Sequence, residues 1–177
     1  MTQQVSQTTM ASYLQAFASA LGDRGIDPGP VFERAGLEVL TSSDPLKRIS
    51  ELEVTQLFQV AVEATGDPCF GIAVGERMQP GNLHALGFGI LSSSSLRDFY
   101  NRVCNYYRVV SQSADFRSYD VDGQSILAAS NVGENVCYET QDAWVTMMVR
   151  FLRFLYQSPV DPLWVELARP EPTGGPG

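Results

Sequence analysis

The sequence contains few of the residue types that hold nucleic acid or carry common catalytic mechanisms. Its 177 residues include one histidine, one lysine and eleven arginines against 20 acidic residues, and its formal net charge is −8 at pH 7. A surface that binds phosphates by releasing counterions needs clustered basic side chains. We therefore expect that this chain does not bind nucleic acid by itself. The single histidine, His84, also excludes any mechanism that uses two histidines.

Cysteine is scarce as well, and its spacing excludes two kinds of site. Cys69, Cys104 and Cys137 are odd in number and far apart, and they form no C-x-x-C pair. The sequence therefore indicates neither a disulfide framework nor a zinc site. Each cysteine stands among apolar neighbours, so we expect all three to be buried as small apolar groups.

The motifs of the common enzyme classes are missing too. The sequence contains no nucleophile elbow, no phosphate-binding P-loop and no H-E-x-x-H, and its glycines do not form a dinucleotide fingerprint. We predict no metal site, no cofactor and no enzyme activity. Acid–base catalysis by carboxylates stays open, because such carboxylates meet only in three dimensions.

Long apolar runs are absent. No segment approaches the roughly 18 consecutive apolar residues of a membrane span, and the N-terminus MTQQVSQTTM lacks the basic and apolar regions of a secretory signal. We expect a cytoplasmic protein without membrane contact. The length and the 44% hydrophobic content predict a single domain with its own core.

Hydrophobic spacing predicts that the first half is helical. The expected helices run from a cap at Ser6, Thr8 or Thr9 to Gly22, from Asp27 to Gly36, from Ser50 to Thr65 and from Phe70 to about Met78, with a loop over Leu40–Ile49. Ser50 and Glu53 have the spacing of a capping box, in which side chain and backbone satisfy each other reciprocally. The small residues Gly71, Ala73 and Gly75 indicate close packing against another backbone.

The second half adds strands to helices. Helices are expected over Leu83–Leu91, Leu96–Ser111 and Tyr138–Tyr156, and strands over Phe116–Val121, Ser125–Ser130 and Leu163–Leu167. The helix Leu96–Ser111 should bury Leu96, Phe99, Val103, Tyr106, Tyr107 and Val110. Asp122-Gly123 is the dipeptide most typical of a tight hairpin. The expected fold class is α+β: mostly helical, with a small antiparallel sheet, in a single domain.

Three local patterns, taken in order, resemble a known family. They are Gly25-Ile26-Asp27 with Ala35-Gly36-Leu37, Thr65-Gly66-Asp67-Pro68 with Phe70-Gly71 and Gly75-Glu76, and Leu86-Gly87 with serines, Leu96-Arg97 and Tyr106-Tyr107. In this order the chain, over roughly Tyr13 to Pro172, resembles the N-terminal arabinose-binding type regulatory domain of bacterial AraC/XylS-family transcription regulators.

The resemblance implies a function. Residues 1–168 would be a sensor domain, here truncated, that binds a small-molecule effector and forms a homodimer, and residues 169–177 would be a flexible tail. DNA would be bound only through a C-terminal helix-turn-helix module that this chain does not contain. The alternative is a free-standing small-molecule-binding or scaffold protein without DNA-binding activity.

The expected effector pocket lies between the segment Gly81–Leu91 and the helix Leu96–Ser111. Its polar groups would be His84, Tyr106 and Arg108, against an apolar wall of Phe88 and Trp144. Arg108 could hold the carboxylate of an amino acid or organic acid in bidentate fashion. The competing interpretation is that the aromatic residues are core and that the arginines are solvated or paired with acidic residues.

The helix Tyr138–Tyr156 is the candidate for dimerisation. Met147, Met148, Phe151 and Phe154 spread over more than one stripe of this helix. A helix that is apolar on several sides either contacts a second copy or lies in the centre of its own domain, and the sequence leaves both interpretations open.

Overall fold

The computed structural model describes residues 7–37, 46–157 and 160–171. Its helices are α1 (Leu14–Gly22), α2 (Pro28–Arg34), α3 (Glu51–Thr65), α4 (Phe70–Arg77), α5 (His84–Leu91), α6 (Leu96–Val110) and α7 (Tyr138–Tyr156). Its strands are β1 (Thr8–Met10), β2 (Arg48–Ser50), β3 (Ala114–Val121) and β4 (Gln124–Asn131), and its 3-10 turns are η1 (Ala11–Tyr13) and η2 (Pro80–Leu83). The strands form two antiparallel pairs, β1–β2 and β3–β4. The predicted α+β class, mostly helical, is confirmed.

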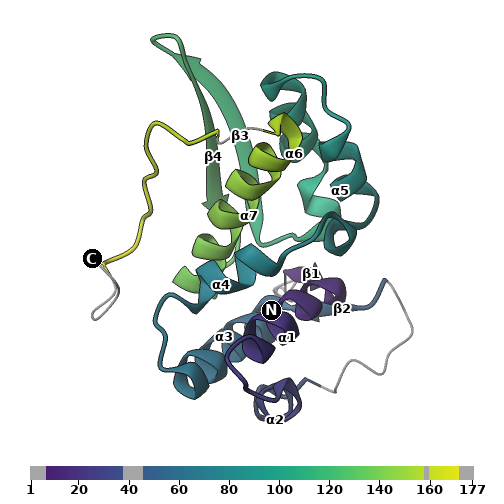
Figure 1. The fold of residues 1–177 in the computed structure, drawn as a ribbon, viewed down its shortest axis with the longest axis vertical. Coiled ribbons are helices and arrows are strands. Elements are labelled where there is room, and N and C mark those ends of the chain that lie inside the picture. Colours follow the sequence, from purple (N-terminus) through teal and green to yellow (C-terminus); the bar gives the residue numbers. More distant parts are fainter. Residues whose placement is uncertain (1–6, 38–45, 158–159, 172–177) are drawn as a thin grey trace, which may run out of the picture.

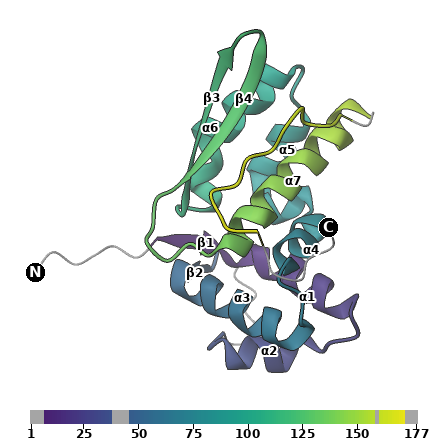
Figure 2. The ribbon, with the colours of Figure 1, turned by 90° about the vertical axis from the view of Figure 1, so that its left-hand side faces the viewer.

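The elements gather into two halves that share one hydrophobic core. Figure 1 shows α1, α2, α3 and the β1–β2 pair in the lower half, and α5, α6, α7 and the long β3–β4 hairpin in the upper half. Helix α4 joins them, because it packs against α1 and α3 on one side and against α7 on the other. Figure 2 shows the hairpin standing beside α6 at the edge of the molecule. Among the described residues, every helix is too short or too polar to span a bilayer.

The predicted helix signals act as expected. The Ser50 hydroxyl accepts from the Glu53 backbone N–H at 3.2 Å, and the Glu53 carboxylate accepts from the Ser50 N–H at 2.6 Å, which completes the capping box of α3. Asp27 caps α2 through the Gly29 N–H. The helix prediction over Leu83–Leu91 is also confirmed by α5.

The close packing predicted from small residues is found between α4 and α7. A Cβ atom at Gly71 would lie 2.1 Å from the carbonyl oxygen of Glu139, and one at Gly75 would lie 2.7 Å from that of Ala143. Side chains at these positions would push the two helices apart. The glycines therefore let α7 lie directly on α4, the helix that links the two halves.

The hairpin forms in the predicted register around its turn. Val121 pairs with Gln124, and Asp122 and Gly123 both have positive φ, at 50° and 79°, as a type I′ turn requires. Only the first residues of β3 enter the core, where the Phe116 ring lies 4.6 Å from that of Tyr107. The turn end extends into solvent.

The cap predicted for the first helix and part of the predicted loop were wrong. Thr8 and Thr9 do not cap α1, because they belong to β1, which pairs with β2 and places Thr8 opposite Ser50. The strand β2 begins within the expected loop Leu40–Ile49 and ends at Ser50. The hydroxyls of both threonines are used by distant partners, at Arg48, Gln112 and Ser111. Ser6 and residues 38–45 lie outside the described residues.

The strand expected over Leu163–Leu167 is also absent from the described part of the chain. This segment is extended but pairs with no described strand, and its apolar side chains are exposed. It runs back along the outside of α7 (Figures 1 and 2). Just after this segment, Arg169 forms a buried salt bridge with Asp142 of α7. The Arg169 guanidinium also lies 5.7 Å from the ring centre of Tyr138.

Candidate functional site

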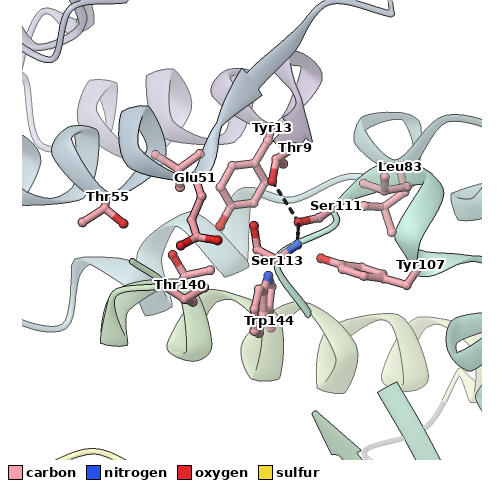
Figure 3. A pocket seen from close by; sticks show the side chains of 13 residues that line it. Thr9, Tyr13, Glu51, Thr55, Leu83, Tyr107, Ser111, Ser113, Thr140 and Trp144 are labelled. Atoms are coloured by element: carbon pink, nitrogen blue, oxygen red, sulfur yellow. Dashed lines mark hydrogen bonds between the residues drawn. The ribbon is translucent and has the colours of Figure 1, made fainter. Parts of the chain in front are cut away.

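A small internal cavity lies where the two halves of the molecule meet. Its lining comes from η1 and β1, from the first turns of α3, from the end of α6 and the segment after it, and from α7 (Figure 3). The lining residues are Thr9, Tyr13, Glu51, Val54, Thr55, Leu83, Tyr107, Val110, Ser111, Ser113, Val136, Thr140 and Trp144. The space available to the centre of a water molecule is about 10 Å³, which corresponds to about one water.

Glu51 is the charged residue of this lining. It is the first residue of α3, and its place three residues before Val54 puts it on the apolar stripe of that helix, where it is 6% exposed. One carboxylate oxygen, Oε1, accepts from the backbone N–H of Asn135 at 2.6 Å. The other oxygen, Oε2, is buried without a hydrogen-bond partner among the described residues. Because α3 begins here, its dipole favours a negative charge.

Tyr13 brings a second unsatisfied polar group to the cavity. Its hydroxyl is buried and has no hydrogen-bond partner in the part of the chain that the structure describes. Burial raises the pKa of this hydroxyl well above its ordinary value of 10.0, and the neighbouring Tyr107 and Cys137 raise the pKa further. Figure 3 shows the Tyr13 hydroxyl, the Glu51 carboxylate and the Thr140 hydroxyl pointing toward one another.

Three other hydroxyls of the lining, those of Thr9, Ser111 and Thr140, have partners. The hydroxyls of Thr9 and Ser111 lie 2.8 Å apart, and the Ser111 oxygen also accepts from the Ser113 N–H at 3.3 Å. The Thr140 hydroxyl lies 3.2 Å from the Cys137 thiol. Burial raises the pKa of that thiol to about 11.

The loop between β4 and α7, residues 132–137, covers one side of the cavity. Its Asn135 donates to Glu51, its Asn135 carbonyl accepts from the Thr55 hydroxyl, and Val136 lines the cavity. Gly133 lies so close to Glu51 that a Cβ there would be 1.7 Å from Oε2. The loop is otherwise largely exposed, and its hydrogen bonds with Glu51 and Thr55 of α3 hold it over this side of the cavity.

The lining combines hydrogen-bonding oxygens with apolar side chains. It offers one carboxylate, several hydroxyls and an apolar wall, and the described residues that line it include no basic side chain. No group of three histidine, cysteine or acidic residues is placed to hold a metal ion within the described residues. A carboxylate and hydroxyls without cationic neighbours favour a ligand that donates hydrogen bonds.

A second, open depression lies between α2 and α3. It has a volume of about 530 Å³ and is lined mainly by polar side chains, with Arg34 and Glu63 paired at 2.8 Å. It contains none of the unsatisfied buried polar groups found among the described residues.

The structure places one of the five predicted effector-site residues in the internal cavity. Trp144 is buried and lines it. Phe88 and Tyr106 are 66% and 57% exposed, so Tyr106 is not on the inner side of α6 as expected. Arg108 is exposed and pairs with Asp115 at 3.2 Å, as the competing interpretation stated. His84 begins α5 with a positive φ of 50° and a buried, unpartnered Nε2 among the described atoms.

Of the four residues expected to form a dimer interface, three are buried and one is exposed. Met147, Met148 and Phe151 are buried in the core of the chain itself, which is the central-helix interpretation. Phe154 is 68% exposed. All three cysteines are free thiols and half-buried, so they are less enclosed than expected.

Sequence reasoning missed Glu51 and treated Tyr13 as core alone. The spacing of the sequence did contain a signal for Glu51. Glu51 stands three residues before Val54 and seven before Phe58, so it lies on the apolar face of the predicted helix. Such a residue is buried with a partner or faces a cavity. No local pattern indicated that the segment after α6 would meet it.

Comparisons with known proteins agree with the resemblance read from the sequence. The family described as "Arabinose-binding domain of AraC transcription regulator, N-term" matches residues 25–176. The ornithine utilization regulator of Pseudomonas aeruginosa is 26% identical to this chain over 118 residues, which cover 67% of this chain and 35% of that protein. The chain thus spans about a third of the length of this relative.

Proposed function

Because the chain belongs to the family of N-terminal arabinose-binding domains of AraC transcription regulators, we propose that it senses a small-molecule effector for such a regulator. DNA binding by a C-terminal helix-turn-helix module is part of this proposal. The acidic composition of the chain, at −8, agrees with a division in which another segment holds DNA.

The observation that carries the proposal is the internal cavity with two unsatisfied polar groups. Leaving a buried polar group without a partner costs free energy, which a bound molecule can recover. Glu51 Oε2 and the Tyr13 hydroxyl meet this description among the described residues, and both line one cavity. We place the effector there rather than at the exposed Tyr106 and Arg108.

The position of the cavity supports a sensing role. Glu51 and Tyr13 come from the lower half, whereas Thr140 and Trp144 come from α7 in the upper half (Figure 3). A ligand that contacts both halves changes their relative free energy, and this is what a ligand must do to shift a conformational equilibrium. With room for about one water, the cavity must enlarge to admit an effector, and loop 132–137 is the cover with the fewest buried side chains.

A fluorescence experiment tests this site. The chain has two tryptophans, so Trp164→Phe leaves Trp144, in the cavity wall, as the single reporter. This variant is screened with amino acids, polyamines, organic acids, aromatic acids and fatty acids. L-ornithine comes first because the relative is named as a regulator of ornithine utilization. We expect one class to change Trp144 emission and to raise the melting temperature, because a ligand at 100 times its Kd stabilises the fold by about 2.7 kcal/mol.

Arg108→Ala provides the matched comparison with the site expected from the sequence. If the cavity is the site, this variant binds the same compound with unchanged affinity in calorimetry. A compound that stabilises the protein without changing Trp144 emission, and that loses affinity on Arg108→Ala, would instead place the effector on the outside of α6 and refute the cavity.

We also propose that the chain forms a homodimer, with Phe154 at the contact. Of the four residues expected at the interface it is the exposed one, and it lies near the C-terminal end of α7. Sedimentation of the chain and of Phe154→Asp tests the assignment. Dimer in the parent and monomer in the variant is the expected result, and an unchanged dimer would move the contact elsewhere.

A further inference from the structure

We propose that the cavity receives a primary ammonium group and that Glu51 is its counter-ion. This assignment deepens the proposed function and rests on it, because it names the chemical class of the effector. An effector that carries an aliphatic amine would place its –NH₃⁺ between Glu51, Tyr13 and Thr140.

The charge balance of the cavity points to a cation. Glu51 is the charged member of a lining that, in the described residues, includes no arginine, lysine or histidine. Its Oε1 accepts from a neutral backbone N–H, and Oε2 has no partner among the described groups. A carboxylate ligand would bring like charge to this buried group, whereas an ammonium group supplies a charge-assisted hydrogen bond.

The size of the cavity selects among cations. The free space fits about one water molecule, and an ammonium head group is of that size whereas a planar guanidinium is larger. An ammonium group has three donors. The Glu51 carboxylate, the Tyr13 hydroxyl and the Thr140 hydroxyl bring oxygens that point toward one another at this space (Figure 3).

The remainder of the ligand needs a path to the outside, and the structure offers one beside Glu51. Thr55 is half-buried and Asn135 is exposed, and the hydrogen bond between them closes the gap between α3 and loop 132–137. Opening this bond would let an alkyl chain leave the cavity along α3 while its amine stays at Glu51.

A bound water and the dipole of α3 offer a different account of Glu51. In that account the carboxylate holds loop 132–137 through Asn135, and one water satisfies Oε2 and the Tyr13 hydroxyl. A ligand series separates the two accounts, because a water site shows no preference for amines.

The test compares matched small probes on the Trp164→Phe chain. n-Butylamine and 1,4-diaminobutane carry the ammonium group, whereas 1-butanol, 1,4-butanediol and butyrate do not. We expect calorimetry and Trp144 emission to detect the amines and not the other three. Glu51→Gln keeps an oxygen for the Asn135 N–H but removes the charge, and it should weaken amine binding about 10- to 100-fold.

Two further variants guard against a merely structural effect. Glu33→Gln makes the same charge change on the exposed face of α2, and it should leave amine affinity unchanged. Tyr13→Phe keeps Glu51 and removes one of the three oxygens, so the affinity should fall about 2- to 10-fold. If Glu51→Gln does not fold, as judged by circular dichroism, Tyr13→Phe still decides the assignment.

The outcomes separate the inference from the proposed function. If another compound class changes Trp144 emission while amines bind no better than alcohols, or if Glu51→Gln binds amines as the parent does, the ammonium assignment is wrong and the cavity remains the effector site. If amines bind without changing Trp144 emission and independently of Tyr13 and Glu51, both the assignment and the cavity site fail.

Discussion

Buried hydroxyl groups at the cavity differ in whether they have a partner, and this difference has measurable consequences. The Thr9 hydroxyl has one in Ser111 at 2.8 Å, whereas the Tyr13 hydroxyl has none among the described residues. A satisfied hydrogen bond contributes about 1 kcal/mol, but an unsatisfied buried hydroxyl costs free energy. The cavity therefore maintains a binding group at the expense of stability in the unliganded protein.

We predict that Tyr13→Phe does not destabilise the unliganded chain. Its free energy of unfolding should be unchanged or higher by up to about 1 kcal/mol, because the lost hydroxyl has no described partner. Thr9→Val, which is nearly isosteric, should lower it by about 1 to 2 kcal/mol because the Ser111 hydroxyl loses one of its two hydrogen bonds and keeps only the one from the Ser113 N–H. Urea denaturation measures both. Equal destabilisation by the two variants would indicate that a bound water satisfies Tyr13.

Cys137 lies at the end of loop 132–137, and its thiol should react slowly. Burial is the largest cause that raises its pKa to about 11. The thiolate is the reactive form. In a Cys69→Ser, Cys104→Ser chain, the rate of labelling by a thiol reagent should therefore keep rising through pH 10. In urea the thiol has its ordinary pKa of 9.0, so the labelling rate of the same chain should level off at a lower pH. A plateau below pH 9 in the folded chain would contradict the burial of this thiol.

At the scale of elements, the contact between α4 and α7 depends on glycine. We predict that Gly71→Ala lowers the free energy of unfolding by at least about 2 kcal/mol, because its Cβ would meet the Glu139 carbonyl at 2.1 Å. Gly22→Ala, at the end of α1, meets no atom within 4 Å. It should raise the free energy by about 0.5 kcal/mol by restricting the unfolded chain. Urea denaturation measures the free energy of unfolding of the two variants. Equal effects of Gly71→Ala and Gly22→Ala would show that α4 and α7 can move apart without loss of stability.

The elements that sequence predicted well are those whose signals are local. The capping box of α3 and the Asp122-Gly123 turn act within a few residues, and both were found. The pair β1–β2 was missed because each strand has three residues and its partner is about 40 positions away. The strand expected over Leu163–Leu167 has the right composition, but a strand also needs a neighbour.

The candidate site could be predicted only in part for the same reason. Trp144 was predicted because aromatic residues line most ligand sites. Glu51 and Tyr13 are 38 positions apart in the chain and line the same cavity only because of the tertiary fold, which no local pattern encodes. Tyr106 and Tyr107 are adjacent, and a shift of one residue around α6 decides which of them faces the cavity.

At the scale of the whole molecule, the hydrophobic core is one cluster that passes from α1 through α4 to α7. A ligand in the cavity therefore contacts both halves and can act on a single cooperative unit. If the two halves unfolded separately, a ligand in the cavity would stabilise each half to a different extent. Its binding would then affect only the contact between the halves.

We predict that the chain unfolds in a single transition, as the expected single domain requires. In the Trp164→Phe chain, Trp144 emission reports the cavity and the upper half, while far-UV circular dichroism reports all helices. The two signals should give the same urea midpoint, because the continuous core couples α1–α3 to α7 and small single domains are usually two-state. An effector of the cavity should move both midpoints together, since it binds only the folded state. If the Trp144 emission changed at a lower urea concentration than the circular dichroism signal, the two halves would be separately stable. An effector bound in the cavity would then act by holding the two halves together.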